Sequence, residues 1–125
     1  MAIEWEYDEL TVPLGFTRTS TVHGHLSDRR DEEAGRRLVR EQYAEVVGAH
    51  LRRAAEAGWQ PAEPADFDSA SRSGRLRVRT AINKESTTFG FGEVRATTIT
   101  HLYEAVTIRL RRPMDPRAAP GSPSS

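Results

Sequence analysis

Hydrophobic and polar residues alternate at the start of the chain. Trp5 and Tyr7 are separated and flanked by acidic residues, a period of two that predicts a strand over residues 3–12. The apolar positions then move to even numbers, which predicts a bulge near residues 8–9. Pro13, soon followed by a glycine, is expected to end the strand, because proline lacks the amide hydrogen that a central strand needs.

The middle of the chain has a different period. Residues 16–27 are polar and predict a loop, or at most a short edge strand. Apolar residues then recur every three to four positions, which predicts an amphipathic helix over residues 31–57. These positions are Val39, Tyr43, Val46, Val47, His50, Leu51 and Ala54. Gly58 suits the left-handed position after a helix, and Trp59 is expected to fold back on the last turn.

The second half of the chain returns to strand-like patterns. Residues 60–74 predict a surface connection that is anchored by a single phenylalanine. Residues 75–82 alternate apolar and basic side chains, which predicts a half-buried strand, and residues 83–92 predict a turn region. Residues 93–112 lack glycine and proline and are rich in β-branched residues, so they predict one long bent strand or two strands broken near His101.

Together these elements predict an α+β fold, in which one long helix packs on a small antiparallel sheet of three to five strands. Trp5, Tyr7 and Trp59 are expected to lie between the sheet and the helix, because each large ring can bury ~150–250 Å². Residues 1–113 are expected to form a single domain. Residues 114–125 are rich in proline, serine and alanine, and they predict a disordered tail.

Three short motifs resemble those of a known group of domains. The chain carries W-E-Y at residues 5–7, G-W-Q at residues 58–60 and R-R-P at residues 111–113. This pattern resembles small bacterial domains of unknown function that begin W-E-Y, carry a G-W-E-like signature at the helix end and close on a basic strand followed by proline. The resemblance implies one helix packed on a small antiparallel sheet, and it implies no particular chemistry. Gln60 stands where those domains usually carry an acid, and Pro61 interrupts what is typically their next strand.

Composition narrows the compartment and the chemistry. The chain carries 18 basic and 18 acidic residues, so no net charge draws it to nucleic acid or to an anionic membrane. It has no cysteine, which excludes disulfides, thiolate metal sites and cysteine nucleophiles and fits a reducing compartment. No apolar run approaches the ~20 residues of a membrane-spanning helix, and the N-terminus lacks a secretory signal pattern. We therefore expect a cytoplasmic protein without cofactors.

Arginine dominates the basic residues of the predicted strands. Arg75, Arg77 and Arg79 share one strand face, as do Arg109 and Arg111 on the last strand. Neighbouring strands would gather these side chains into a surface that binds an anion, nucleic acid or a protein partner. The alternative is a solvated face whose arginines pair with the acidic residues of the first strand. Repulsion between like charges favours placing that acidic strand between the two basic ones.

The turn region contains Phe89-Gly90-Phe91-Gly92. Exposed phenylalanines on such a loop could form a mobile lid or a partner-binding tip, or could stack on nucleic-acid bases. In the alternative, the loop is a hairpin whose rings pack at the rim of the core. The segment does not match a phosphate-binding motif, because no glycine-rich pattern here follows a strand and opens a helix.

Histidines offer the remaining candidate chemistry. His23 and His25 would point the same way in an extended segment and could bind a metal ion with His101, Asp28 or Glu104 as a third ligand. No metal-binding motif supports such a site, so none is predicted. In a strand, His101 and Tyr103 share a face while Glu104 points away, so this spacing assembles no catalytic triad.

These patterns favour a non-enzymatic interaction or assembly module that self-associates through the sheet edge, the Phe89–Phe91 loop and the arginine face. Binding of nucleic acid or another anion by the arginine face is the second hypothesis. The third hypothesis is a metal-dependent or small-molecule enzyme built around His23, His25 and His101.

Overall fold

The computed structural model describes residues 2–23 and 29–115, in four strands and two helices. The elements in chain order are β1 (Trp5–His23), α1 (Arg29–Glu56), β2 (Gln60–Pro61), α2 (Phe67–Ser73), β3 (Leu76–Phe89) and β4 (Gly92–Pro113). The predicted α+β fold, with one long helix and an antiparallel sheet of three to five strands, is therefore confirmed. Most of the predicted tail, residues 116–125, lies outside the described residues.

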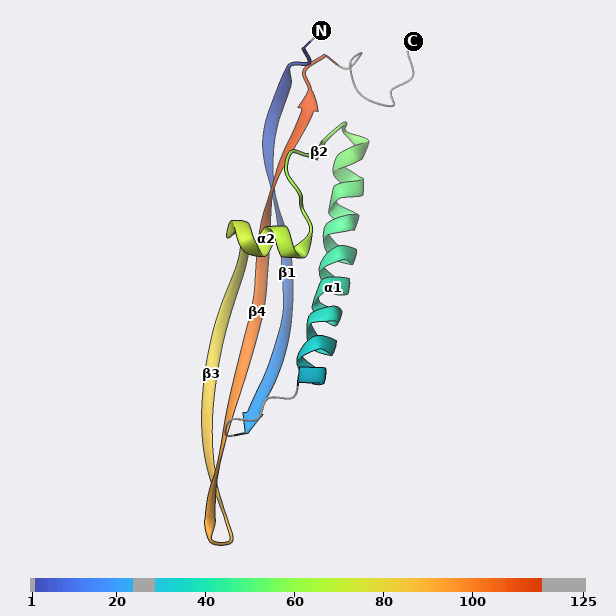
Figure 1. Ribbon diagram of the computed structural model, residues 1–125. Coiled ribbons are helices and arrows are strands. Elements are labelled where there is room, and N and C mark those ends of the chain that lie inside the picture. Colours follow the sequence, from blue (N-terminus) through green and yellow to red (C-terminus); the bar gives the residue numbers. More distant parts are fainter. Residues whose placement is uncertain (1, 24–28, 116–125) are drawn as a thin grey trace.

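The long strand β4 is the centre of the sheet. β1 pairs with one edge of β4 from Trp5↔Pro113 to His23↔Ala96, and β2 and β3 share the other edge. Helix α1 lies along β1, and α2 crosses the sheet near the start of β3 (Figure 1). Beyond the end of β1, β3 and β4 continue as a two-stranded arm that extends past both helices (Figure 1).

The core lies between α1 and the part of the sheet next to α2. Its largest fully buried side chains are Tyr43 of α1, Val12 of β1 and Val106 of β4. Phe67 packs edge-on against Tyr43, with ring centroids 5.5 Å apart, and also contacts Tyr103. Such aromatic pairs contribute about 0.5–1.5 kcal/mol beyond the area that they bury. The predicted role of Phe67 as an apolar anchor is confirmed.

Helix α1 ends as the sequence indicates. Gly58 has a φ of 86°, and the amide of Trp59 donates to the carbonyl of Ala54 at 3.1 Å. This backbone geometry is the left-handed cap that glycine allows without steric cost. Trp59 packs partly buried against the core, so its predicted place between helix and sheet is confirmed.

The first strand is longer than predicted. Pro13 does not end β1, and residues 16–23 continue it as an edge strand, so the alternative to a loop is the one found, as part of a longer strand. Pro13 is tolerated because β1 is an edge strand, where a residue that lacks the backbone N–H need not remove a hydrogen bond from the ladder. The bulge lies at residues 14–15, not at 8–9, and Gly15 accommodates it with a φ of 77°.

The second half also differs from the prediction in three places. Residues 60–74 contain the short strand β2 and the helix α2, which is capped by Asp66 at its start and by Gly74 at its end. The turn region shrinks to two residues, since Phe89 already pairs with Gly92. Residues 93–112 belong to one strand, whose irregularity lies at Glu104 and not at His101.

Trp5 and Tyr7 lie on the face of the sheet opposite α1, which corrects the prediction that they pack under the helix. Their neighbours in the next strand are Arg111 and Arg109, which alternate with the buried residues Leu110 and Ile108. Glu6, the acidic residue between the rings, therefore faces the helix side, where it pairs with Arg112. Alternation alone gives two faces but does not say which one is covered.

The hydroxyl of Tyr43 joins α1 to the segment before α2. It donates to the carbonyl of Ala65 at 2.6 Å, and burial followed by the charge of Asp66 raises the pKa of Tyr43 to about 12. The phenol therefore stays a neutral donor over the ordinary pH range.

We predict that Tyr43→Phe lowers the free energy of unfolding by about 1 kcal/mol, because the Ala65 carbonyl loses its partner. Urea unfolding followed by circular dichroism at one protein concentration measures the loss. Tyr7→Phe, which removes a hydroxyl from a half-exposed ring, should change stability by less than about 0.5 kcal/mol. Equal effects of the two substitutions would contradict this role of the hydroxyl.

Candidate functional site

The five arginines that the sequence singles out do lie on one face of neighbouring strands. They alternate with residues of the helix side, of which Leu76, Ile108 and Leu110 are buried, and so point away from α1. Their positions are Arg75, directly before β3, Arg77 and Arg79 on β3, and Arg109 and Arg111 on β4. Charge repulsion predicted that the acidic strand β1 would lie between β3 and β4. This is wrong, because β4 is central and pairs with both β1 and β3.

Acidic residues outside β1 relieve that repulsion. Arg75 lies 2.5 Å from the carboxylate of Glu63, and Arg109 lies 3.9 Å from the same group. Arg79 pairs with Glu104 at 2.9 Å. Glu104 is able to reach β3 because it is an extra residue of β4 in the ladder with β3. Local acids therefore neutralise much of the arginine face.

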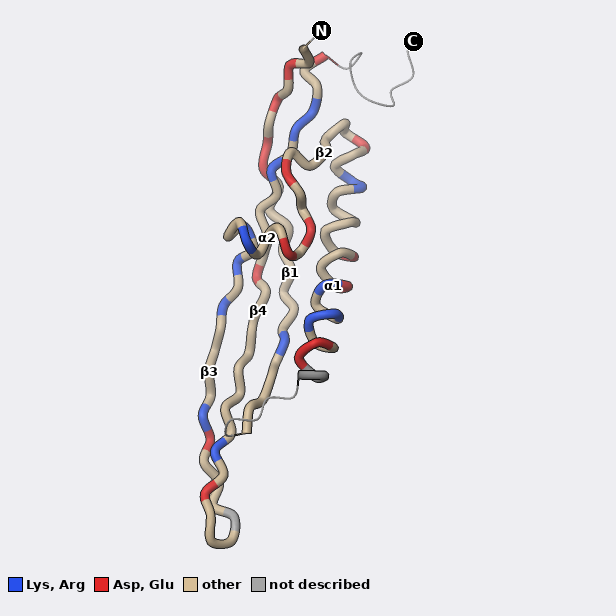
Figure 2. The backbone as a smooth tube through the Cα atoms, viewed as in Figure 1, with Lys and Arg blue, Asp and Glu red and all other residues tan. Residues whose placement is uncertain are grey.

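Aromatic rings hold the arginines of β4. The guanidinium of Arg109 lies 4.6 Å from the ring centre of Tyr7, and that of Arg111 lies 4.2 Å from the ring centre of Trp5. Figure 2 shows these basic positions of β4 beside the acidic positions of β1. Of the five arginines, Arg77 has neither an ion pair nor a ring contact within the described part of the chain. Nucleic-acid binding by this face stays a prediction that these contacts do not test.

The Phe89–Phe91 loop is the tip of the hairpin between β3 and β4. Gly90 has a φ of 61° and Phe91 a negative one, which matches a two-residue turn with glycine in its first position. The side chain of Phe91 is fully exposed and does not pack at the rim of the core. The side chain of Phe89 lies outside the described residues.

The apolar face of β3 is mostly uncovered. Leu76 is buried, but Val78 is 39% exposed and Ile82 is 61% exposed, although the sequence predicts all three on one inward face. Helix α1 overlies β1 and does not reach across to β3 (Figure 1). Every described side chain from Arg77 to Thr88 is exposed.

The two free edges of the sheet differ in chemistry. The β1 edge is interrupted by Pro13 and by the bulge at residues 14–15. The β3 edge contains no proline, glycine or interruption from Val78 to Phe89. Prolines and bulges are features that protect an edge strand from pairing with another chain. The β3 edge lacks both.

The histidines do not assemble a metal site within the described residues. His23 lies near the end of β1 opposite Ala96, and His101 pairs with Arg18 on the face that carries the core. His25 lies outside the described residues. Among residues 2–23 and 29–115, no group of three histidine or acidic side chains is close enough to hold a metal ion. His101 and Tyr103 share a face and Glu104 points away from it, as predicted, and the structure adds that Glu104 pairs with Arg79.

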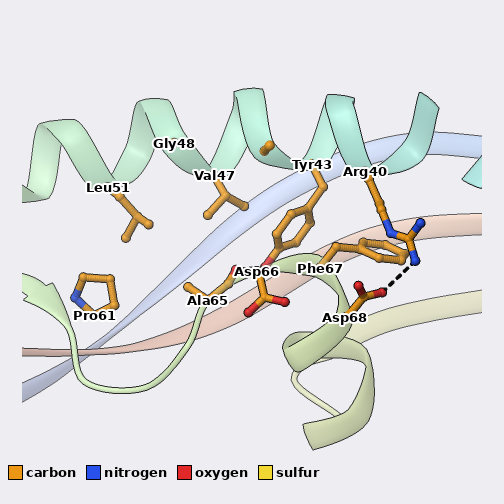
Figure 3. A pocket seen from close by; sticks show the side chains of 11 residues that line it. Arg40, Tyr43, Val47, Gly48, Leu51, Pro61, Ala65, Asp66, Phe67 and Asp68 are labelled. Carbon is orange, nitrogen blue, oxygen red and sulfur yellow. Dashed lines mark hydrogen bonds and ion pairs between the residues drawn. The ribbon is translucent and has the colours of Figure 1, made fainter. Parts of the chain in front are cut away.

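A cavity that the sequence did not reveal lies between α1 and residues 61–68. It has a volume of about 520 Å³ and walls that are mainly apolar, formed by Val47 and Leu51 of α1 and by Phe67 of α2. Figure 3 shows Val47 and Leu51 pointing from α1 toward Pro61 and the loop, while Phe67 enters from α2. Ligand sites usually measure about 300–1,000 Å³ and combine apolar walls with a few polar groups. The sequence feature that could have pointed to this cavity is Gly48, because a glycine inside a helical pattern suggests a packing or functional reason.

Charged groups stand at the end of the cavity near α2. Arg40 and Asp68 form an ion pair at 3.0 Å, drawn as a dashed line in Figure 3. Asp66 caps α2 by accepting from the amide of Ser69 at 3.2 Å. Hydrogen bonds from the side chain and backbone of Ser69 lower the pKa of Asp66, so this carboxylate is charged at neutral pH.

Comparison with protein-family models, with curated proteins and with solved structures finds no match to this chain. The resemblance to small bacterial domains of unknown function therefore stays a prediction. Within the described ranges, neither helix has the length and apolar character that crossing a membrane requires.

The position of His101 in the sheet makes the stability of the fold depend on pH. Its Nδ1 is hydrogen-bonded to the hydroxyl of Thr80 at 3.2 Å, and burial followed by the charge of Arg18 lowers the pKa of His101 below 6.5. A proton therefore binds more tightly to this histidine in the unfolded chain. The resulting stability is present above pH 6.5 and is lost as the pH falls below that value.

The melting temperature of the original chain should fall between about pH 7.5 and pH 5.5. We predict that it falls less in His101→Gln, since glutamine has no proton to gain in this range. Differential scanning calorimetry across the pH series measures the slope. His23→Gln, at an exposed position on β1, should retain the slope of the original chain. Identical slopes with and without His101 would show that another group is responsible.

Proposed function

We propose that this chain is a non-enzymatic interaction module whose copies associate through the free edge of β3. The observation that carries this proposal is the exposure of β3, which pairs on one side only and is covered on neither face from Arg77 to Thr88. An edge strand of this length presents unpaired backbone donors and acceptors to solvent. Another strand can satisfy those groups by extending the sheet.

The arm also lacks enough packing to be stable by itself. From Ser86 to Phe89 the sheet consists of β3 and β4 alone, because β1, on the other edge of β4, ends opposite Ala96. Isolated two-stranded hairpins are at best marginally stable in water, whereas three or more strands with an apolar face are stable. A second copy that pairs with β3 would supply additional strands and cover Val78 and Ile82.

The sequence of β3 complements itself in an antiparallel pairing centred on Ile82. In that register Arg79 lies opposite Glu85 of the second copy, twice by symmetry, and Ile82 lies opposite itself. Opposite charges across strands stabilise by roughly 0.2–1 kcal/mol per pair, and like charges destabilise. No like charges face each other from Leu76 to Thr88 in this register, which uses almost the whole strand.

Other features of the arm fit the same arrangement. The register brings the hairpin tip of each copy, with the exposed ring of Phe91, toward the start of β3 in the other. Glu85 has no ion pair within the part of the chain that the structure describes, so it is available to Arg79 of the second copy, which would then lie between Glu85 and its own Glu104. The β1 edge is a poorer site for strand addition, because Pro13 and the bulge after it interrupt the ladder.

We expect size-exclusion chromatography with light scattering to show a dimer that dissociates on dilution. Ile82→Lys places two like charges opposite each other at the centre of the pairing and should raise the dissociation constant at least about tenfold. The matched control is Thr21→Lys, at an exposed position on the other edge strand. Circular dichroism confirms that both variants are folded. A monomer at every concentration, or equal weakening by both variants, would refute the edge pairing.

The absence of cysteine gives a direct test of the register. Single-cysteine variants Ile82→Cys and Thr21→Cys are treated with a short bis-maleimide. We expect covalent dimers from Ile82→Cys, because residue 82 meets itself across the two-fold axis, and few or none from Thr21→Cys. Efficient cross-linking at Thr21 instead would place the contact on β1.

A further inference from the structure

The cavity between α1 and residues 61–68 is separate from the β3 edge and plays no part in the proposed pairing. Its walls come from α1, the segment after β2 and the start of α2, and none of its lining residues belongs to β3 (Figure 3). Apolar groups such as Val47, Leu51 and Phe67 line its length, whereas its charged groups stand at one end. This arrangement fits a ligand with an apolar body and one polar end.

Between its larger side chains, the wall that α1 gives to the cavity contains two small residues. Ala44 and Gly48 lie one turn apart on this side, between Arg40 and Leu51. A glycine inside a helix costs about 1 kcal/mol relative to alanine. Packing does not explain it, because a Cβ at Gly48 would meet only the end of the flexible Arg52 side chain, at 3.2 Å. Because Gly48 has no side chain, the cavity extends up to the backbone of α1 at this position.

The charges that line the cavity are unequal. Arg40 is already paired with Asp68 at 3.0 Å, which leaves the carboxylate of Asp66 without an ionic partner at the rim. Asp66 accepts a hydrogen bond from the Ser69 amide, but it receives no cation within 4 Å in the described residues. One arginine and two aspartates give the lining a net charge of −1. Two further cations lie near the cavity: Arg52 stands beside Gly48, and Arg72 of α2 is close enough for its charge to lower the pKa of Asp66, although it forms no ion pair with that carboxylate within 4 Å.

From this charge and shape we infer that the cavity binds a small amphiphilic cation, an amine whose apolar body lies along α1 and whose ammonium group pairs with Asp66. The apolar body would contact Val47, Leu51 and Phe67, which together supply most of the burial. The ammonium group would form a charge-assisted hydrogen bond at the rim, where the geometry of the α2 cap holds the carboxylate in place. An anion of the same shape would meet two carboxylates.

Three probes with one carbon skeleton test this inference: 4-phenylbutylamine, 4-phenylbutanol and 4-phenylbutyrate. Isothermal calorimetry and amide NMR shifts of the full chain measure binding of each probe. We expect the amine to bind about tenfold more tightly than the alcohol and the carboxylate, with the largest shifts at Ala44, Gly48 and Ala65. Equal affinities for the three probes, a preference for the carboxylate, or no binding of the amine would overturn the inference.

Asp66→Asn isolates the charge. Asparagine caps helices about as well as aspartate, so α2 should remain folded while the carboxylate is lost. The variant should lose about tenfold in amine affinity and bind the alcohol unchanged. Glu93→Gln, which removes an acid from the distant arm, is the matched control and should bind both probes as the original chain does. An unchanged amine affinity in Asp66→Asn would exclude the assigned ion pair.

Gly48→Leu tests the place of binding. The leucine side chain would occupy the apolar space beside Val47 and should abolish binding of the amine and the alcohol. Circular dichroism and the melting temperature show whether the helix is intact. Binding that survives in a folded Gly48→Leu variant would locate the amine elsewhere on the molecule.

Discussion

The structure depends on the contact between a single apolar stripe of α1 and a sheet that is larger than the stripe can cover. Tyr43 from the helix meets Val12 and Val106 from two strands, and these are the most deeply buried large side chains of the core. One helix can bury only the strands directly beneath it. Everything beyond that contact has to be stabilised by α2, by the hydrogen-bond ladder itself or by another molecule.

This unequal coverage separates the molecule into two regions with different chemistry. Near α2, the helices, the loop after β2 and the sheet enclose a core and a cavity. Farther along β3 and β4, the sheet has no cover, and its side chains are polar, charged or exposed apolar groups. The two proposed activities follow this division, since a concave space suits a small ligand and an open edge suits another strand. They share no residue and can be disrupted separately.

The sequence predicts the elements whose local signals agree with their surroundings. The long helix, its glycine cap and the role of Phe67 follow from periodicity and from single residues with defined conformations. It does not show which face of β1 is covered, because Trp5 and Tyr7 alternate with acids equally well on either side. The rings lie on the open face because β1 has no bulge before Pro13 and buries the even-numbered Val12; there the arginines of β4 stack on them. Helix α2 has capping residues at both ends but too few residues for a periodic pattern.

The irregularity at Glu104 has a consequence for how the chain can change. On β4, Val106 and Tyr103 both face the core although an odd number of positions separates them, so the alternation of the strand restarts at this point. The parts of β4 before and after Glu104 therefore place side chains on the core face in different phases of the sequence. Substitutions in the exposed distal part of β3 and β4 can therefore change what this part binds, while the buried residues near α2 remain restricted by packing.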